Sequence, residues 1–309
     1  MSSRSPRLGL VQVSLAGVLW GTGGLAVQLL RERVPMSVLA ISGWRTGIAA
    51  VVLVGTVLAL RRASEVRRVL GHRPWTAVAT GLLTGSYQAF YFAAVISVGV
   101  TVSTVVALGL APVLLTGAES VLARRMPRRG KLLVLAAALG GLVLVSTSAG
   151  GAQTGPHPLR GVLLACGSGL TYALATGLGR PLAEVSSPLA LAAVTTSAGA
   201  LGMVPVGLVA GGPAAQDLGT LGLLAYLGVM TLAVAYALLY AGLRTIEGSA
   251  ALVATLLEPV TAAVLAAAVL GERLGPLGLV GALLILAAVA GLDEGGAGTS
   301  PVPEGPAPL

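Results

Sequence analysis

Charged residues are scarce in this chain of 309 residues, since Lys, Arg, Asp and Glu make up only 10% of it, against about 25% in an ordinary soluble domain. Hydrophobic residues make up 55%, and the mean hydropathy is +0.92. A soluble protein of this size needs a charged shell around its core, and so few charges cannot form one. The composition therefore excludes a soluble enzyme, a nucleic-acid-binding domain and a disordered protein. It indicates an integral membrane protein whose apolar surface faces lipid.

Cysteine and histidine are almost absent. Cys166 is the only cysteine, and it lies in an apolar run, which excludes a disulfide framework and a thiolate metal site. His72 and His157 lie in connecting segments, so no histidine remains for acid–base chemistry inside a membrane. The sequence also lacks an HExxH motif, a Walker loop and a dinucleotide fingerprint. We therefore expect no catalytic residues, no metal site and no cofactor.

Long apolar runs dominate the chain. A helix that crosses a hydrocarbon core of about 30 Å needs roughly 20 apolar residues. This rule predicts ten spans, at approximately 10–29, 36–60, 75–96, 100–122, 131–149, 159–179, 188–209, 219–241, 248–270 and 276–292. The first apolar run is too long for the core of a signal peptide, so we interpret it as a retained helix.

The basic residues predict the orientation of these spans. The net charge of +8 does not indicate a nucleic-acid partner, because Lys and Arg fall in short clusters between apolar runs, as is typical of membrane topology. With the N-terminus inside, the clusters at 61–73 and 124–131 are also inside, and few basic residues remain in the outer loops. We therefore expect residues 1–9 in the cytoplasm, and the Gly-, Pro- and acid-rich residues 293–309 as a disordered cytoplasmic tail.

The sequence contains an internal repeat. Residues 86–93 resemble residues 235–242 with both tyrosines in register, and residues 105–113 resemble residues 252–260. Each copy holds five spans, and because five is odd the second copy starts on the opposite side of the membrane. We expect an all-α integral membrane protein with ten transmembrane helices in two inverted-topology five-helix repeats, a fold typical of secondary transporters. The expected division is 10–149 for the first repeat, 150–158 for a linker and 159–292 for the second repeat.

Five motifs resemble those of a known family, the ten-helix EamA-type permeases of the drug/metabolite transporter superfamily. They are Leu19-Trp20-Gly21, Pro35 followed by Trp44-Arg45, the helix of Pro112, Leu257-Glu258-Pro259-Val260 and Leu270-Gly271-Glu272-Arg273-Leu274. The resemblance covers roughly residues 8–292, although the first half reads Leu122-Ala123-Arg124-Arg125-Met126 where the last motif has its acid. It implies export of amino acids, other metabolites or toxic compounds across the bacterial inner membrane.

Two charged residues are expected near the middle of the bilayer, where each costs roughly 2.5–3.5 kcal/mol on insertion scales. Arg45 lies in the second predicted span and Glu258 in the ninth. In one interpretation they face a substrate, with Arg45 holding a carboxylate and Glu258 holding a cation or a transferable proton. In the other they form a structural ion pair, or a hydrogen bond to the backbone, that fixes helix packing. Glu119, near Arg124 at the inner end of its span, is interpreted as an interfacial anchor.

Mid-span prolines and aromatic residues give further candidates. Pro112 and Pro259 each remove a backbone donor, which suits a gate or, alternatively, a static packing kink. The remaining candidates are polar or aromatic residues that could line a cavity, although the tyrosines could also form an aromatic belt at the membrane surface. They are Trp20, Tyr87, Gln88, Tyr91, Ser103, Tyr172, Tyr236 and Tyr240.

The function that these patterns favour is secondary transport by alternating access, with export as the expected direction and proton coupling as one mode. The expected partners are the lipid bilayer, a small-molecule substrate and, in that mode, protons. The sequence does not indicate an oligomeric state or a particular substrate. A membrane-embedded enzyme and a non-transporting accessory or sensor component remain the alternatives.

Overall fold

The computed structural model describes residues 5–148, 156–211, 217–270 and 275–296, and within these ranges it contains helices and no strand. The predicted N-terminal segment, linker and tail lie partly outside them, at residues 1–4, 150–155 and 297–309. The helices are α1 (Pro6–Arg33), α2 (Val38–Ala59), α3 (Ala63–His72), α4 (Pro74–Val98), α5 (Val100–Ala123), α6 (Arg129–Ser148), α7 (Pro158–Val185), α8 (Pro188–Val209), α9 (Leu218–Gly228), η1 (Val229–Val234), α10 (Ala235–Gly242), α11 (Gly248–Ala254), α12 (Leu257–Leu270) and α13 (Pro276–Gly296).

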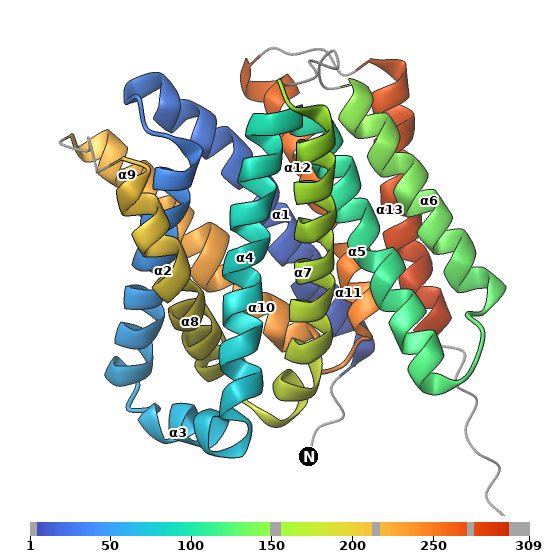
Figure 1. Ribbon diagram of the computed structural model, residues 1–309. Helices are drawn as coiled ribbons and strands as arrows, with labels where there is room; N and C mark the ends of the chain where they lie inside the picture. The colour runs from blue at the N-terminus through green and yellow to red at the C-terminus, as the bar shows by residue number, and fades with distance from the viewer. Residues whose placement is uncertain (1–4, 149–155, 212–216, 271–274, 297–309) are drawn as a thin grey trace, which may run out of the picture.

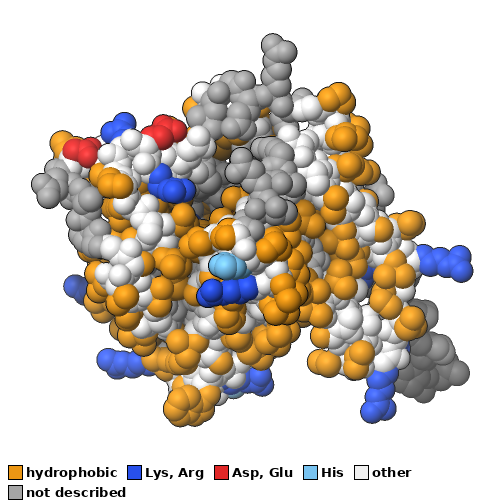
Figure 2. Space-filling view, turned by 45° about the horizontal axis from the view of Figure 1, so that its top comes forward, with side chains coloured by type: hydrophobic (Ala, Val, Ile, Leu, Met, Phe, Trp, Pro, Cys, Tyr) orange, Lys and Arg blue, Asp and Glu red, His pale blue; other side chains and the backbone are white. Residues whose placement is uncertain are grey.

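The described helices confirm the predicted fold class. Nine segments are long and apolar enough to cross a membrane, and Pro276–Leu292 of α13 is a shorter apolar helix. Large hydrophobic side chains remain exposed along the flanks of the bundle, and Figure 2 shows them covering much of the surface, with few charged groups among them. Such a surface is stable only against lipid. The chain is a multi-pass membrane protein.

The helices begin at residues suited to that position. Pro74, Pro158 and Pro188 stand at the start of their helices, where the missing N–H has no partner to lose. Ser187 accepts a hydrogen bond from the backbone N–H of Ala190, and Asp217 caps α9 in the same way. Several helices continue beyond the predicted spans, because hydropathy marks only the stretch inside hydrocarbon while helical hydrogen bonding continues outside it.

The two sets of five spans interlock with a matched pattern of contacts. Helix α4, the third span of the first set, packs on α7, the first span of the second set. In the same way α10, part of the third span of the second set, packs on α1, the first span of the first set. The packing of α5 on α7 likewise corresponds to that of α1 on α12, and α2–α8 and α6–α13 pair equivalent helices. This exchange symmetry is the arrangement expected of an inverted repeat.

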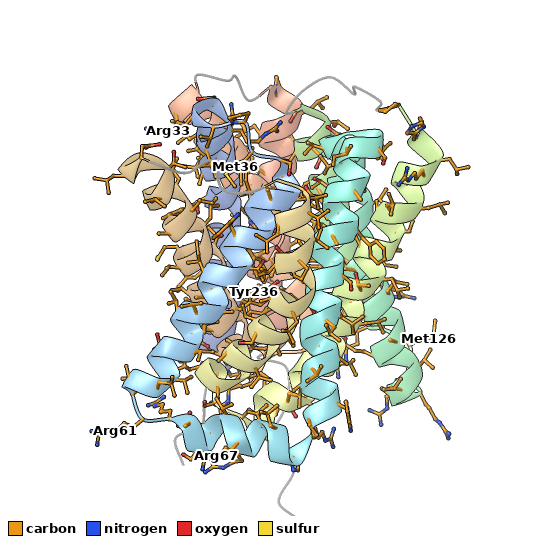
Figure 3. All side chains as sticks on the ribbon, turned by 60° about the vertical axis from the view of Figure 1, so that its left-hand side comes forward. Arg33, Met36, Arg61, Arg67, Met126 and Tyr236 are labelled. Carbon is orange, nitrogen blue, oxygen red and sulfur yellow. The ribbon has the colours of Figure 1, made fainter. Side chains whose placement is uncertain are left out.

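The two ends of the bundle are easily distinguished. The N-terminal end of α1 and the short helix α3 lie at one end, which we call the α3 end (Figure 1). Figure 3 places Arg61 and Arg67 at this end, Arg33 and Met36 at the opposite end, and Tyr236 about midway between them. Residues near Tyr236 therefore lie deep inside the membrane-spanning part of the bundle.

The last helices of the two sets, α6 and α13, approach each other closely. A Cβ added to Gly141 would lie 2.6 Å from the carbonyl oxygen of Gly281, and one added to Gly281 would lie 2.7 Å from the carbonyl oxygen of Gly141. Small residues permit such backbone contact between helices in a membrane. Helix α13 packs mainly on α6 and touches α1 and α12 only weakly, so this pair lies at one side of the bundle (Figure 1).

Two spans of the second repeat are irregular. The eighth span changes from α9 to the π-helical turn η1 before it continues as α10. The ninth span is broken between α11 and α12, at Thr255 and Leu256. Pro259 lacks the N–H that would bond to the carbonyl of Thr255, and the backbone N–H of Glu258 donates to that carbonyl instead, at 2.9 Å. In contrast, α5 continues through Pro112 without a break.

Candidate functional site

A polar group lies between α2 and α4. The guanidinium of Arg45 donates to Gln88 Oε1 at 2.8 Å, and Ser42 Oγ donates to the same oxygen at 3.1 Å. The Arg45 guanidinium carbon also lies 5.8 Å from the centre of the Phe92 ring, within the range of a cation–π contact. Its Nε is buried and has no hydrogen-bond partner among the residues that the structure describes. Arg45 therefore retains a donor for a further acceptor.

Three tyrosines lie next to this group. The rings of Tyr87 and Tyr172 are stacked with centroids 4.7 Å apart, and Tyr91 lies 6.3 Å from Tyr87 on the same face of α4. The hydroxyl of Tyr172 donates to Thr255 Oγ1 at 3.2 Å, at the break in the ninth span. Tyr91 shares a hydrogen bond of 2.8 Å with Thr104 of α5. These rings connect α4 of the first repeat to α7 and α11 of the second.

A second aromatic group comes from α1 and α10. Trp20 and Tyr236 meet edge to face with ring centroids 5.4 Å apart, and Tyr240 lies 6.3 Å from Tyr236 along α10. Tyr236 is 6% exposed and Tyr240 is 2% exposed. Tyr240 is therefore a packed core residue, whereas Trp20 keeps partial accessibility.

Glu258 lies in the first turn of α12, immediately after the break. In the part of the chain that the structure describes, its carboxylate forms no hydrogen bond and no ion pair, yet Glu258 and Arg45 interact electrostatically. Both side chains are partly exposed although they belong to the middle of the bundle. Arg45 and Glu258 therefore lie near each other without a direct contact among the described residues.

Two glycines bring α1 against the broken span. A Cβ on Gly21 would lie 2.5 Å from the carbonyl oxygen of Glu258 and 2.6 Å from the Cβ of Thr261. A Cβ on Gly17 would lie 3.1 Å from the Cα of Thr255. The backbone around Glu258 is therefore fixed by direct contact with α1, which comes from the other repeat.

We call the residues around this charged pair the central cluster: Trp20, Ser42, Arg45, Tyr87, Gln88, Tyr91, Phe92, Tyr172, Tyr236, Thr255 and Glu258. Its members come from α1, α2 and α4 of the first repeat and, in the second repeat, from α7, α10, α12 and the break between α11 and α12. Over the described residues there is no group of three His, Cys, Asp or Glu that could hold a metal ion. The cluster offers one cation, one anion, amide and hydroxyl groups, and aromatic faces. This set suits a small polar or zwitterionic molecule.

Ser103 and Pro112, two of the predicted site residues, are not joined to this cluster within the described ranges, and two residues that belong to it were not predicted. Ser103 is buried, and its hydroxyl donates to the carbonyl of Gly99 in its own helix, at 2.7 Å. Pro112 is buried within continuous α5. Ser42 and Phe92 could not be predicted from the sequence, because each is recognised only by a contact with a residue of another helix. Residues 271–274, which hold the acid of the last family motif, lie outside the described residues.

Comparisons with known proteins concern the family and the fold of the whole chain. The model of the EamA-like transporter family matches residues 7–147 and 159–292. A protein of Bacillus subtilis (strain 168) named "Uncharacterized transporter YwfM" is 27% identical over 277 residues, which cover 89% of this chain and 90% of that protein. A solved crystal structure is similar with a TM-score of 0.74 at 19% identity, covering 92% of this chain and 95% of that one. The last similarity concerns the fold alone.

Proposed function

This chain belongs to the EamA-like transporter family, and from that premise we propose that it is a secondary exporter that carries small metabolites by alternating access. The substrates that we propose are amino acids or related compounds, including toxic ones. Transporters of this kind bind their substrate near the middle of the membrane, between two inverted repeats. The central cluster occupies such a position.

The observation that carries this proposal is the arrangement of Arg45 and Glu258. The first repeat supplies the cation and the second supplies the anion, and the two interact without an ion-pair contact among the described residues. A charge near the middle of a membrane-spanning bundle is costly, so it is expected to have a functional role. We assign the carboxylate of a substrate to Arg45 and its amino group, or a transported proton, to Glu258.

Alternating access requires the two repeats to move about the substrate. The break at Thr255 and Leu256 and the π-helical turn η1 both lie beside the central cluster and provide places where a span can bend. When Glu258 binds and releases a proton on opposite sides of the membrane, an inward proton gradient drives export. Because Pro259 has no N–H, the helical hydrogen bond to the carbonyl of Thr255 cannot form at the break. We assign Pro112 the weaker role of a bend within α5.

We further propose that the α3 end faces the cytoplasm of a bacterium and that both termini lie there. Arg61, Arg67 and the other basic residues of the segment around α3 lie at this end (Figure 3), and the positive-inside rule supports that orientation. With this orientation, the substrate leaves at the opposite end, next to Arg33.

The test is a transport screen in sealed proteoliposomes with an imposed pH gradient, using amino acids and toxic analogues as candidate substrates. We expect at least one to move in a saturable manner, faster with the gradient than without it. Protein-free vesicles and vesicles containing Glu258→Gln are the controls. Chemical conversion of a candidate without net movement, or movement that does not saturate, would contradict the proposal.

A further inference from the structure

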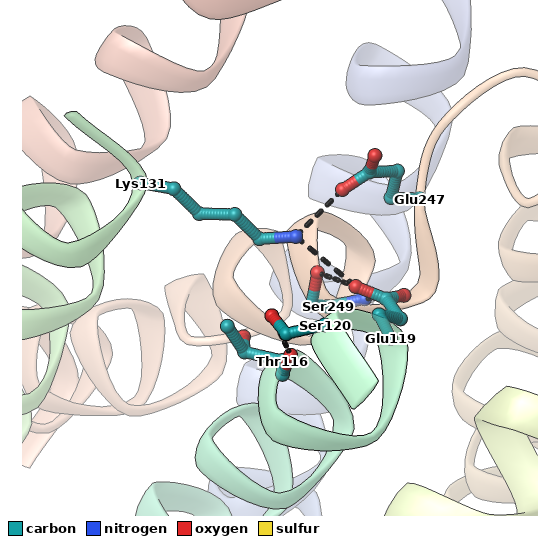
Figure 4. Close-up of polar contacts among 6 residues, drawn as sticks. All are labelled: Thr116, Glu119, Ser120, Lys131, Glu247 and Ser249. Atoms are coloured by element: carbon teal, nitrogen blue, oxygen red, sulfur yellow. Dashed lines mark hydrogen bonds and ion pairs between the residues drawn. The ribbon is translucent and has the colours of Figure 1, made fainter. Parts of the chain in front are cut away.

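A second polar group lies at the α3 end, away from the central cluster. The Lys131 ammonium lies 3.1 Å from Glu119 Oε2 and 2.7 Å from Glu247 Oε2. The backbone N–H of Ser249 donates to Glu119 Oε1 at 3.1 Å, and its hydroxyl donates to Glu119 Oε2. Figure 4 shows these contacts. The interfacial anchor expected at Glu119 is therefore joined to Lys131 and to the second repeat.

These contacts cross between the two repeats. Glu119 is near the C-terminal end of α5 and Lys131 is in the first turn of α6, both in the first repeat. Glu247 and Ser249 stand at the start of α11 in the second repeat. The side chain of Lys131 is 30% exposed and that of Glu119 22% exposed. Ionic contacts that are partly shielded from water in this way are stronger than fully exposed ones.

Helix α11 connects this group to the central cluster. It has only seven residues, from Gly248 to Ala254, and packs chiefly on α5. At one end Ser249 bonds to Glu119, and at the other Thr255 bonds to Tyr172. The break at Thr255 and Leu256 then separates α11 from α12, which carries Glu258. A rotation of α11 about this break would alter both ends together.

We propose that Glu119, Lys131, Glu247 and Ser249 form a latch that closes the α3 end by holding the two repeats together, and that α11 is the element that moves when the latch opens. The inference rests on the proposed function, because it assigns the latch to one of the two gates of alternating access. The latch couples the gate to the site through α11: when Thr255 shifts against Tyr172, Ser249 loses its position on Glu119.

The ionic state of the latch supports this role. The hydrogen bond from Lys131, the largest influence, lowers the pKa of Glu247, and Arg180 acts in the same direction. A lowered pKa means that the stabilisation is present above the ordinary value of 4.5 and is lost only as the pH falls below it. The contact between Lys131 and the Glu247 carboxylate is therefore retained at neutral pH. We assign the opening of the latch to movement of α11.

The test measures access to a buried position beside the latch. Cys166→Ala removes the only cysteine, and Leu115→Cys then introduces a reporter on α5. Leu115 is 7% exposed, and its side chain lies 2.8 Å from where a Cβ on Gly248 would be. The reporter is treated with a membrane-impermeant thiol reagent, added to either side of sealed vesicles. The variants compared are Lys131→Met, Lys131→Arg and, as matched control, Arg129→Met, an exposed cation in the same helical turn.

We expect Lys131→Met to speed labelling from the α3 side about tenfold, the order of effect of losing one charge-assisted hydrogen bond. Lys131→Arg and Arg129→Met should label as slowly as the parent. If Lys131→Met and Arg129→Met are labelled at equal rates from the α3 side, the proposal of a latch is overturned. Faster labelling from both sides with a lower melting temperature would also overturn it, because that result describes general loosening. The labelling experiment uses no substrate. It therefore tests the latch even where the transport experiment fails.

Discussion

Glu258→Gln is expected to reduce export driven by a pH gradient to the level of protein-free vesicles. The substitution keeps the size of the side chain and a polar end, but it removes both the negative charge and the ability to carry a proton. Glu258 is the carboxylate of the central cluster, and Arg45, the other charged side chain of that cluster, cannot replace it, because a guanidinium carries the opposite charge and does not release its proton. Because the Glu258 carboxylate forms no hydrogen bond within the described ranges, the fold should lose little stability.

The measurement compares gradient-driven flux with substrate exchange in the same proteoliposomes. If Glu258 acts only as a proton carrier, exchange should persist while gradient-driven export is lost; if it also binds the substrate amino group, both should be lost. Glu184→Gln is the matched control, because Glu184 pairs only with Arg180 at an exposed position on α7. Export by Glu258→Gln that stays fast and still responds to pH would remove both roles from this residue.

Arg45→Met is expected to raise the apparent KM for a carboxylate substrate roughly 10- to 100-fold, since a hydrogen bond to a charged group contributes about 1.5–3 kcal/mol. Methionine keeps an apolar stem of similar length but removes the guanidinium, together with its contact to the Phe92 ring and its hydrogen bond to Gln88. The effect should be confined to substrates with a free carboxylate. An ester or a decarboxylated analogue should be transported with nearly unchanged apparent KM.

Competition measurements with paired analogues provide the test. Arg67→Met is the control, since Arg67 is an exposed cation on α3, far from the cluster (Figure 3). If Arg45→Met raises the KM equally for the acid and its ester, Arg45 positions Gln88 and Ser42 rather than binding the carboxylate. A lower melting temperature with an unchanged KM would make it a structural residue.

The number and type of the spans could be predicted because each requires a long apolar run, and such runs depend only on local composition. The positions of irregular backbone were harder to predict. Proline at 112 and at 259 gives the same local pattern, yet only the second accompanies a break. Close glycine contacts do not explain the difference, because Gly17 and Gly21 bring α1 against the broken span while a Cβ on Gly169 of α7 would lie 2.8 Å from the carbonyl oxygen of Ala107 in unbroken α5. The π-helical turn Val229–Val234 contains neither proline nor glycine and has no evident mark in the sequence.

The candidate site was predictable to the extent that it depends on rare residue types. A charge in an apolar run is visible without a structure, which is why Arg45 and Glu258 were selected. Residues with common side chains were not. Ser42 resembles many other serines until its hydroxyl is seen to share Gln88 Oε1 with Arg45. The latch was missed for the same reason, because Lys131 and Glu247 are far apart in the sequence and meet only when the repeats pack together.

The central claim is that Arg45 and Glu258 line a space that water reaches between the two repeats, and the only two phenylalanines test it most directly. Phe92 lies against Arg45, whereas Phe90 is exposed on α4 and packs near Gly167 of α7. In the Cys166→Ala background, we expect Phe92→Cys to react with a small charged thiol reagent much faster than Phe90→Cys, because a lipid-facing thiol ionises poorly. Reaction of position 90 as fast as position 92 would contradict the account.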